Sequence, residues 1–209
     1  MKPDDIPNFA NKIHKESGRL LSLISDIMEL SQLDEKFSDE EFAPVDLAGV
    51  AAEVAEDLRS NAEKHGITIT VDTKTAVISG NRNQIYELIY NLCDNAIRYN
   101  RENGSVKIIT GDDNEHPFVK VADTGIGIAP EEQGKVFERF YRVDKSRSKA
   151  RGGTGLGLAI VKHAALYHHA TLDLSSELGV GTTITVTFPI QQDLSLIHIS
   201  EPTRRSYIS

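Results

Sequence analysis

Two glycine-rich turns, separated by a basic loop, constrain the fold of this chain more than any other feature of its sequence. The first, Gly125-Ile-Gly127, follows an apolar run that ends at Asp123, and the second, Gly153-Thr-Gly-Leu-Gly157, leads into a helical pattern. Glycine allows positive φ angles and lets a ligand approach the backbone closely. A glycine-rich turn that opens a helix also offers free N–H groups to an anion. The pair therefore predicts one turn that reads a base and another that holds phosphates.

Each turn alone has an ordinary interpretation. A single Gly-x-Gly is usually only a tight turn, and an aspartate before Thr-Gly is a common turn former. The combination is more specific, because Asn91-Leu-Cys-Asp-Asn95 lies upstream and Gly179-Val-Gly-Thr182 lies downstream. Four such blocks in one chain favour a nucleotide site.

On these blocks the chain resembles the ATP-binding domain of sensor histidine kinases, in the wider family of type II topoisomerases, mismatch-repair ATPases and large ATP-driven chaperones. The blocks follow the family's order, and a Phe-rich box lies between the two glycine boxes at Phe137-Glu-Arg-Phe-Tyr-Arg142. The resemblance covers roughly residues 1–190. It implies an α+β fold of the Bergerat type, a two-layer α/β sandwich with helices on one face of a mixed sheet. ATP and Mg2+ are the implied ligands.

Length and composition agree with this reading. The 209 residues and net charge of -8 suit one domain with an appendage and argue against a general nucleic-acid surface. The one cysteine, Cys93, permits no internal disulfide and is expected to be buried. No apolar run approaches the roughly 18 residues of a membrane span. We therefore expect a cytoplasmic protein without membrane contact, although its full-length parent can be anchored in the plasma membrane.

Residues 6–33 show a heptad repeat of apolar residues. Two sets carry it, Ile6, Ile13, Leu20 and Ile27 and, offset by three, Phe9, Leu23 and Leu30. This seam predicts a helix of a bundle or coiled coil, although an amphipathic helix lying on its own domain shows the same pattern. The resemblance favours the second helix of a dimerisation hairpin, within residues 1–35, and implies a homodimer of the full-length protein.

Composition and pattern divide the rest of the chain. Residues 36–45 are polar and acidic and are expected to form a linker before an ATP-binding domain at 46–190. Residues 191–209 have no counterpart in the family, so we expect a non-native, unstructured tail of vector origin. Within the domain the periods predict helices over 47–64, 84–99, 130–137 and 154–169, and strands over 67–71, 76–79, 105–110, 118–122, 171–175 and 182–188. Asp46 and Asn83 are the expected N-caps of the first two helices, and Gly66 is the expected stop of the first.

Three polar residues share one face of the helix that carries the asparagine box. Glu87, Asn91 and Asn95 are spaced by four residues, so they lie along one side of that helix. An unsatisfied amide beside an apolar stripe is costly, so both asparagines need partners. Mg2+ held with a triphosphate would supply them. The alternative is that both amides only cap or tie down neighbouring loops.

The resemblance assigns roles to this helix. Asn91 matches the residue that ligates Mg2+, and Asn95 matches one that contacts phosphate. Arg98 matches a basic residue that meets phosphate, and Tyr99 matches one that packs near adenine. Glu87 matches an acid that orients water in the hydrolytic relatives and would deprotonate or orient the attacking group in a kinase. Glu87, Asn91 and Arg98 are therefore the predicted catalytic residues.

Asp123 is the predicted reader of the base. A carboxylate only accepts hydrogen bonds, and adenine offers an amine where guanine has a carbonyl, so Asp123 is expected to select adenine. The resemblance implies the same role. The other expected nucleotide contacts lie in the glycine boxes, the basic loop and the last Gly-x-Gly-Thr, at Gly125, Gly127, Ile128, Lys145, Gly153, Thr154, Gly155, Leu156, Gly157 and Thr182.

The loop between the glycine boxes is strongly basic. Against one acid, Asp144, it holds the cations Arg142, Lys145, Arg147, Lys149 and Arg151. A charge run is usually only a solvated loop. Because this one lies between two phosphate-directed turns of an acidic protein, we interpret it as a mobile lid that closes over ATP. Phe137 and Phe140 are expected to pack beneath it.

None of the seven histidines has the sequence context of a phosphoacceptor, in which an acidic and a hydrophobic residue follow the histidine. His14, in the seam helix, is expected to face solvent. The resemblance therefore implies the ATP-binding catalytic part of a sensor histidine kinase without its acceptor. Such an enzyme transfers the ATP γ-phosphoryl group to a histidine of a dimerisation domain, for relay to a response regulator.

Three alternatives stay open. A serine kinase that acts on an anti-sigma-factor antagonist shares the boxes but lacks the seam helix. A non-catalytic ATP-binding and dimerisation module is a second alternative, which the intact boxes make less favourable. A conformational ATPase of the topoisomerase type is disfavoured because no second domain follows.

Overall fold

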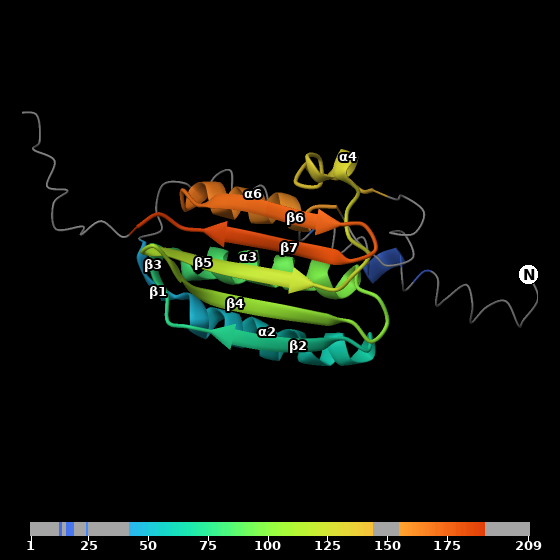
Figure 1. The fold of residues 1–209 in the computed structure, drawn as a ribbon, viewed down its shortest axis with the longest axis horizontal. Coiled ribbons are helices and arrows are strands. Elements are labelled where there is room, and N and C mark those ends of the chain that lie inside the picture. Colours follow the sequence, from blue (N-terminus) through green and yellow to red (C-terminus); the bar gives the residue numbers. More distant parts are fainter. Residues whose placement is uncertain (1–12, 14–15, 19–23, 25–41, 144–154, 191–209) are drawn as a thin grey trace, which may run out of the picture.

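Three helices cover one face of a five-stranded sheet (Figure 1). The helices are α2 (Leu47–Lys64), α3 (Arg82–Arg98) and α6 (Gly157–Tyr167). The computed structural model describes residues 13, 16–18, 24, 42–143 and 155–190. This arrangement confirms the predicted α+β fold, a two-layer sandwich with its helices on one side.

The sheet is mixed, with the strand order β2-β4-β5-β7-β6. One pair, β2 with β4, is parallel, and the other pairs are antiparallel. The strand bounds are β2 Thr68–Thr73, β4 Ser105–Asp113, β5 His116–Asp123, β6 Thr171–Glu177 and β7 Gly181–Thr187. Each of these five strands was expected from the sequence, with bounds that differ by up to three residues at either end.

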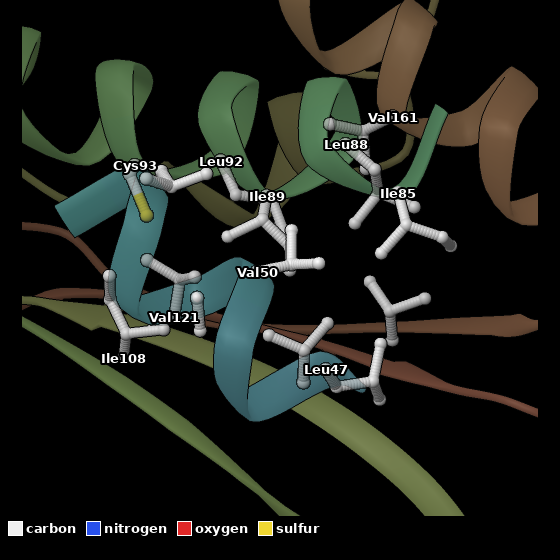
Figure 2. Close-up of a cluster of buried hydrophobic side chains, with 14 of the residues drawn as sticks. Leu47, Val50, Ile85, Leu88, Ile89, Leu92, Cys93, Ile108, Val121 and Val161 are labelled. Atoms are coloured by element: carbon white, nitrogen blue, oxygen red, sulfur yellow. The ribbon is translucent and has the colours of Figure 1, made fainter. Parts of the chain in front are cut away.

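The core lies between the helices and the sheet (Figure 2). Cys93 is fully buried within it, as predicted, and burial raises the pKa of its thiol. The apolar positions expected to face inward on α2 and α3 are all at most 5% exposed, namely Leu47, Val50, Val54, Leu58, Ile85, Leu88, Ile89, Leu92 and Ala96. Burying a large aliphatic side chain stabilises a fold by about 1.5–3 kcal/mol. The buried positions on α3 therefore determine which side of that helix is left for a functional site.

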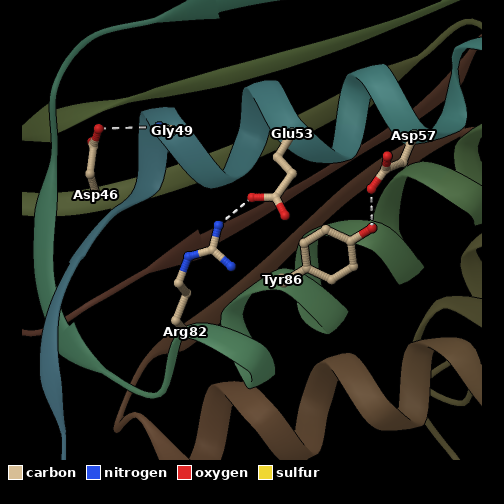
Figure 3. Close-up of polar contacts among 6 residues, drawn as sticks. All are labelled: Asp46, Gly49, Glu53, Asp57, Arg82 and Tyr86. Atoms are coloured by element: carbon tan, nitrogen blue, oxygen red, sulfur yellow. Dashed lines mark hydrogen bonds and ion pairs between the residues drawn. The ribbon is translucent and has the colours of Figure 1, made fainter.

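Two polar contacts also fix α3 against α2 (Figure 3). Arg82 forms an ion pair with Glu53, and the Tyr86 hydroxyl donates to Asp57 Oδ2 at 2.7 Å. Burial and this hydrogen bond raise the pKa of Tyr86 to about 12, so the phenol remains a donor at neutral pH. The contacts hold the helix of the asparagine box at a fixed rotation.

The ends of α2 follow the predicted capping. Asp46 accepts hydrogen bonds from the N–H groups of Ala48 at 3.1 Å and Gly49 at 3.2 Å. At the other end Gly66 has φ +67, and the N–H of Ile67 bonds to the Ala62 carbonyl at 2.9 Å. This pairing around a left-handed glycine is a Schellman motif.

A short strand was not foreseen. Residues 36–45 were expected to form a linker, but β1 (Ala43–Asp46) pairs antiparallel with β3 (Val77–Gly80). The expectation was therefore wrong from Ala43 onward, and residues 36–41 lie outside the described part of the chain. Pro44 cannot donate to a ladder and so suits a two-stranded pair, in which each strand is an edge.

The helix ends also differ from the predictions. Asn81, not Asn83, caps α3, and its Oδ1 accepts from the N–H of Asn83 at 2.9 Å and of Gln84 at 3.1 Å. The short helix α4 (Pro130–Gln133) ends before the expected residue 137, because Gly134 follows it. α6 ends at Tyr167, before His169 with φ 53.

The hairpin of β4 and β5 is tighter than expected. The expected strands over 105–110 and 118–122 left residues 111–117 between them, but the observed turn is only Asn114 and Glu115, with φ 51 and φ 68. Gly111 belongs to the strand instead and is paired with Phe118. A Cβ at Gly111 would lie 3.4 Å from the Phe118 ring, so the glycine makes room for that side chain.

Little of the amino-terminal seam is described. Ile13, residues 16–18 and Ile24 are helical, and Ile13 is 56% exposed. The remaining seam positions, His14 and the tail 191–209 lie outside the described residues. No helix in the described part of the chain is long and apolar enough to cross a membrane.

Candidate nucleotide-binding site

The asparagine box lies on α3 against the start of α6. Asn91 Nδ2 donates to the Glu87 carbonyl at 2.9 Å, and Asn95 Nδ2 donates to the Asn91 carbonyl at 2.9 Å. Both amide nitrogens thus bond within the helix rather than to a neighbouring loop. This orientation leaves the two amide oxygens as acceptors or ligands.

Gly157 brings the second glycine box to this helix. A Cβ at Gly157 would lie 2.9 Å from Asn95 Nδ2 and 3.0 Å from Asn91 Oδ1. Only glycine therefore permits this close approach without displacing an amide. The two blocks, far apart in sequence, meet as the resemblance implied.

The donor set fits Mg2+ that arrives with a nucleotide. Mg2+ prefers oxygen ligands and usually takes one or two from the protein, completing its shell with phosphate and water. The Asn91 amide oxygen, beside the space that a Cβ at Gly157 would fill, is an oxygen donor of this kind. Among the residues that the structure describes, no group of three or more His, Cys, Asp or Glu side chains is placed to hold a metal.

Arg98 and Glu87 flank the asparagines on the same helix. Arg98 Nη2 pairs with Asp94 Oδ2 at 2.7 Å, and the two side chains are 27% and 21% exposed. Glu87 is half-buried one turn before Asn91. The structure thus keeps the three predicted catalytic residues on one helix, with the Arg98 guanidinium positioned by a neighbouring carboxylate.

Asp123 ends β5 at the opposite side of the site. Its Oδ1 accepts from the N–H of Gly125 at 2.7 Å and of Thr182 at 3.3 Å. Among the described residues, the structure records no hydrogen bond to Oδ2. Burial raises the pKa of Asp123, while the two N–H donors oppose that shift. Oδ2 of Asp123 therefore remains an acceptor for a ligand that brings a hydrogen-bond donor.

The first glycine turn is clamped between α3 and the hairpin of β6 and β7. Its Ile126 donates to the Tyr99 carbonyl at 3.1 Å and accepts from the Gly179 N–H at 2.7 Å. Gly127 has φ +68, and a Cβ there would lie 2.0 Å from the Glu177 carbonyl oxygen. Tyr99, the C-cap of α3, is half-buried beside this turn.

The second glycine turn is only partly described. Gly155 has φ +80, and its carbonyl accepts from the Phe140 N–H at 2.8 Å. Leu156 is fully buried and forms a small cluster with Ile160. The predicted contacts Lys145, Gly153 and Thr154 lie outside the described residues, as does most of the basic loop.

The two phenylalanines of the Phe-rich box differ from each other. Phe137 packs against the core, and most of the loop beneath which it was expected to pack lies outside the described residues. Phe140 does not, since it is 56% exposed and has a φ of 64. The prediction for Phe140 was wrong because its N–H bonds to the Gly155 carbonyl, and the associated left-handed turn places its side chain at the surface.

Sequence reasoning missed two residues that hold the first turn. Ser176 Oγ accepts from the Ile128 N–H at 2.8 Å. Gln133 Nε2 donates to the carbonyls of Ile128 and Ser176, each at 2.9 Å. The only signal for Ser176 was its position two residues after Leu174, on the inward-facing parity of its strand.

Comparison with known proteins gives the class. Residues 80–192 match the family described as histidine kinase-, DNA gyrase B-, and HSP90-like ATPase. This match spans the asparagine box, both glycine boxes and the last Gly-x-Gly-Thr. The chain therefore belongs to this family of ATPases, and the resemblance seen in its sequence is confirmed.

Particular relatives are sensor histidine kinases. The sensor-like histidine kinase SenX3 of Mycolicibacterium smegmatis is 39% identical over 192 residues, which is 91% of this chain and 50% of the relative. The mycobacterial sensor histidine kinase MprB has a similar structure, with a TM-score of 0.62 and 29% identity over 71% of this chain and 97% of that one. Full-length ShkA in complex with AMPPNP gives a TM-score of 0.71 and 29% identity over 83% of this chain and 36% of that one. The chain spans 41–50% of the length of the first curated relatives it matches.

Proposed function

We propose that this chain is the ATP-binding catalytic part of a sensor histidine kinase. In the complete protein it transfers the γ-phosphoryl group of ATP to a histidine on a dimerisation domain, from which a response regulator receives it. The strongest support is that the site has two chemically different ends. The Asn91 amide oxygen and the Asn95 amide nitrogen meet Gly157 at one end, and the Asp123 oxygen without a partner among the described residues lies at the other.

The residues divide by ligand group. Asp123 and Thr182 receive adenine, with Tyr99 beside it. The Asn91 amide oxygen holds Mg2+, which neutralises phosphate charge, and Asn95, Arg98 and the second glycine turn meet the phosphates. Glu87 orients the attacking imidazole. Phosphoryl transfer needs little covalent chemistry from the protein, so positioning and charge neutralisation supply most of the rate. The related structure of ShkA, which contains AMPPNP, supports an adenine nucleotide as the ligand.

The first experiment measures Mg2+-dependent ATP binding by calorimetry, in wild type and in Asn91→Ala. The variant should lose the Mg2+-dependent part of the affinity and keep its melting temperature. Asn83→Ala is the matched control, because Asn83 is exposed on the same helix. Equal Mg2+-ATP affinity in wild type and Asn91→Ala would reject the metal role.

The second experiment measures phosphoryl transfer. Supplied with labelled ATP and the separate two-helix domain of its parent, the chain should label that domain in trans, since a free domain can bring its imidazole within attack distance. Loss of the label in acid identifies phosphohistidine. Acid-stable label would favour the serine kinase, and ATP binding without any label would favour the non-catalytic module. Strong acid-labile labelling of this chain alone would contradict the absence of an acceptor and point to His14.

A further inference from the structure

Three polar side chains continue the buried rows of three neighbouring strands at one end of the sheet. On β5, β7 and β6, respectively, Asp123, Thr182 and Ser176 each lie two residues from an inward-facing apolar residue. Ser176 and Thr182 are direct partners in the β6–β7 ladder, and Ala122 pairs with Thr183 in the β5–β7 ladder. Because side chains alternate along a strand, all three lie on the helix-covered face, beside one another.

The hydroxyl proton of Ser176 has a defined destination. Ser176 Oγ lies 3.0 Å from the Gly181 carbonyl oxygen, which can only accept, so the serine proton is directed to that oxygen. The Ile128 N–H donates to Ser176 Oγ at 2.8 Å and uses one of its lone pairs. The remaining contact, to Thr182 Oγ1 at 2.9 Å, therefore takes its proton from the threonine. One donor and two acceptor positions of Ser176 are then all used.

This direction fixes what Thr182 shows to a ligand. With its proton directed to Ser176, the Thr182 hydroxyl offers only lone pairs. Its backbone N–H is also engaged, because it donates to Asp123 Oδ1 at 3.3 Å. The same Oδ1 accepts from Gly125 at 2.7 Å, so both of its lone pairs are used. Asp123 and Thr182 thus present only acceptors to a ligand, one carboxylate oxygen and the threonine hydroxyl oxygen.

A carboxylate alone does not reject guanine. A carboxylate with both oxygens available can accept two hydrogen bonds, one from the ring N–H and one from the amine of guanine. Here Oδ1 of Asp123 is occupied, so that paired contact is denied. A Thr182 hydroxyl that cannot donate also gives the guanine carbonyl no partner, and an unpaired carbonyl in a partly buried site costs affinity.

We propose that Ser176 is a specificity-determining residue for adenine over guanine nucleotides, acting through Thr182. It takes the Thr182 proton and so keeps the Thr182 hydroxyl from donating to the base. The inference rests on the proposed nucleotide function and adds to it a residue that does not itself contact the base. Ser176 is therefore a positioning residue. Its removal should change the ratio of ATP to GTP affinity and should have little effect on the stability of the fold or on ATP binding itself.

The test compares the affinities for ATP and GTP, each with Mg2+, by calorimetry. In Ser176→Ala the Thr182 hydroxyl is free to turn its proton toward the ligand, so the ATP-to-GTP affinity ratio should fall by about tenfold, the value of one hydrogen bond. Ser175→Ala is the matched control, because Ser175 is the exposed neighbour on the same strand. Ser176→Thr keeps the hydroxyl and should retain the wild-type ratio.

A double-mutant cycle tests whether Ser176 acts through Thr182. Thr182→Val removes the hydroxyl whose proton Ser176 takes, so the double variant Ser176→Ala with Thr182→Val should have the same ratio as Thr182→Val alone. Ser176→Cys decides the matter if Ser176→Ala folds poorly, because its sulfur is a weak acceptor for the Thr182 proton and the ratio should again fall.

The outcomes separate this inference from the proposed function. A ratio unchanged in Ser176→Ala, or an equal loss of both affinities, overturns the specificity role and leaves a merely structural serine. Additive effects in the cycle overturn the route through Thr182. A wild-type chain that binds neither nucleotide removes the proposed function itself and the inference with it.

Discussion

The buried carboxylate of Asp123 lowers the stability of the ligand-free protein, and a bound ligand would offset that cost. Burial raises its pKa, so the ionised carboxylate is less favourable in the folded chain than in the unfolded one. For an acid with a raised folded pKa, the stabilising contribution is present while the group is protonated at low pH. It is lost as the pH rises through the folded pKa. At neutral pH the ligand-free protein therefore carries the cost of a buried charge that a bound adenine amine would offset.

Asp123→Asn should separate these two effects. The amide keeps an oxygen for the N–H groups of Gly125 and Thr182 but presents its NH2 group where the base amine needs an acceptor. ATP affinity should fall by about 1.5–3 kcal/mol, the range for a hydrogen bond to a charged group. Chemical denaturation of the ligand-free protein should show the variant gaining stability relative to wild type as the pH rises from acid to neutral. Unchanged ATP affinity would show that Asp123 does not read the base.

Gly157 is a second residue whose role can be tested, here by adding a single carbon atom. Gly157→Ala adds a Cβ between the ends of the Asn91 and Asn95 side chains, which can shift, so the fold should survive. Ala also favours a helix by about 0.5–1 kcal/mol over Gly, which offsets part of the crowding. Calorimetry should therefore show Mg2+-ATP affinity reduced by at least about tenfold, with the melting temperature little changed. Gly134→Ala is the control, since a Cβ there meets nothing within 4 Å, and an equal loss in both variants would contradict the prediction.

At the scale of elements, His168 joins the end of α6 to the start of α3. It is 3% exposed, its Nδ1 bonds to the Ala164 carbonyl at 2.8 Å, and its Nε2 accepts from the Asn81 N–H at 3.0 Å. Its ring stacks on Phe42, with centroids 5.1 Å apart. A ring that accepts at Nε2 must be neutral, and burial lowers the pKa of His168 accordingly.

This junction should weaken in acid. The unfolded chain protonates His168 near its ordinary pKa of 6.5, while the folded chain resists protonation. Stability is therefore complete above that pH and is lost as the pH falls below it, at most by about 1.4 kcal/mol per pH unit for one proton. Urea unfolding of His168→Gln should lack this loss, because Gln can still accept from Asn81, whereas His169→Gln at the exposed neighbour should keep it. Identical pH profiles for wild type and His168→Gln would disprove the assignment.

Long helices with many periodic apolar positions were predictable from the sequence, and short elements were not. The helices over 47–64 and 82–98 carry several apolar positions each, and the cap at Asp46 and the stop at Gly66 mark one of them clearly. β1 has four residues with a proline among them and forms only against β3, so no local pattern announces it. Helix ends at Asn81 and Gln133 depend on tertiary contacts and on a single glycine, which periodicity does not register.

The same contrast holds within the site. Asn91, Asn95, Asp123 and the glycines stand out because their residue types have few other uses in such a pattern. Ser176 and Gln133 act through hydrogen bonds to backbone groups that only the folded chain brings near. The opposite error, at Phe140, arose because an aromatic residue in a motif suggests packing while its backbone conformation decides its exposure.

At the scale of the whole molecule, the domain should be independent of its last residues. Residues 191–209 continue no strand pattern, and β7 already pairs on both sides, with β5 and β6. Deleting residues 193–209 should therefore leave the melting temperature unchanged by calorimetry. A clear decrease would show that the tail packs on the domain and would end its interpretation as non-native.

The pairing of β1 with β3 also has a mechanical consequence. The first residue of β1, Ala43, is opposite the last residue of β3, Gly80, and Asn81 follows directly as the cap of α3. A force that pulls on the chain just before Ala43 would therefore act first on the pair Ala43 and Gly80, one residue from that cap. The force would reach the beginning of the helix that carries Asn91 and Asn95 before it reached the sheet. The β1–β3 pair thus links the amino-terminal end of the described domain to the start of the helix that carries the asparagine box.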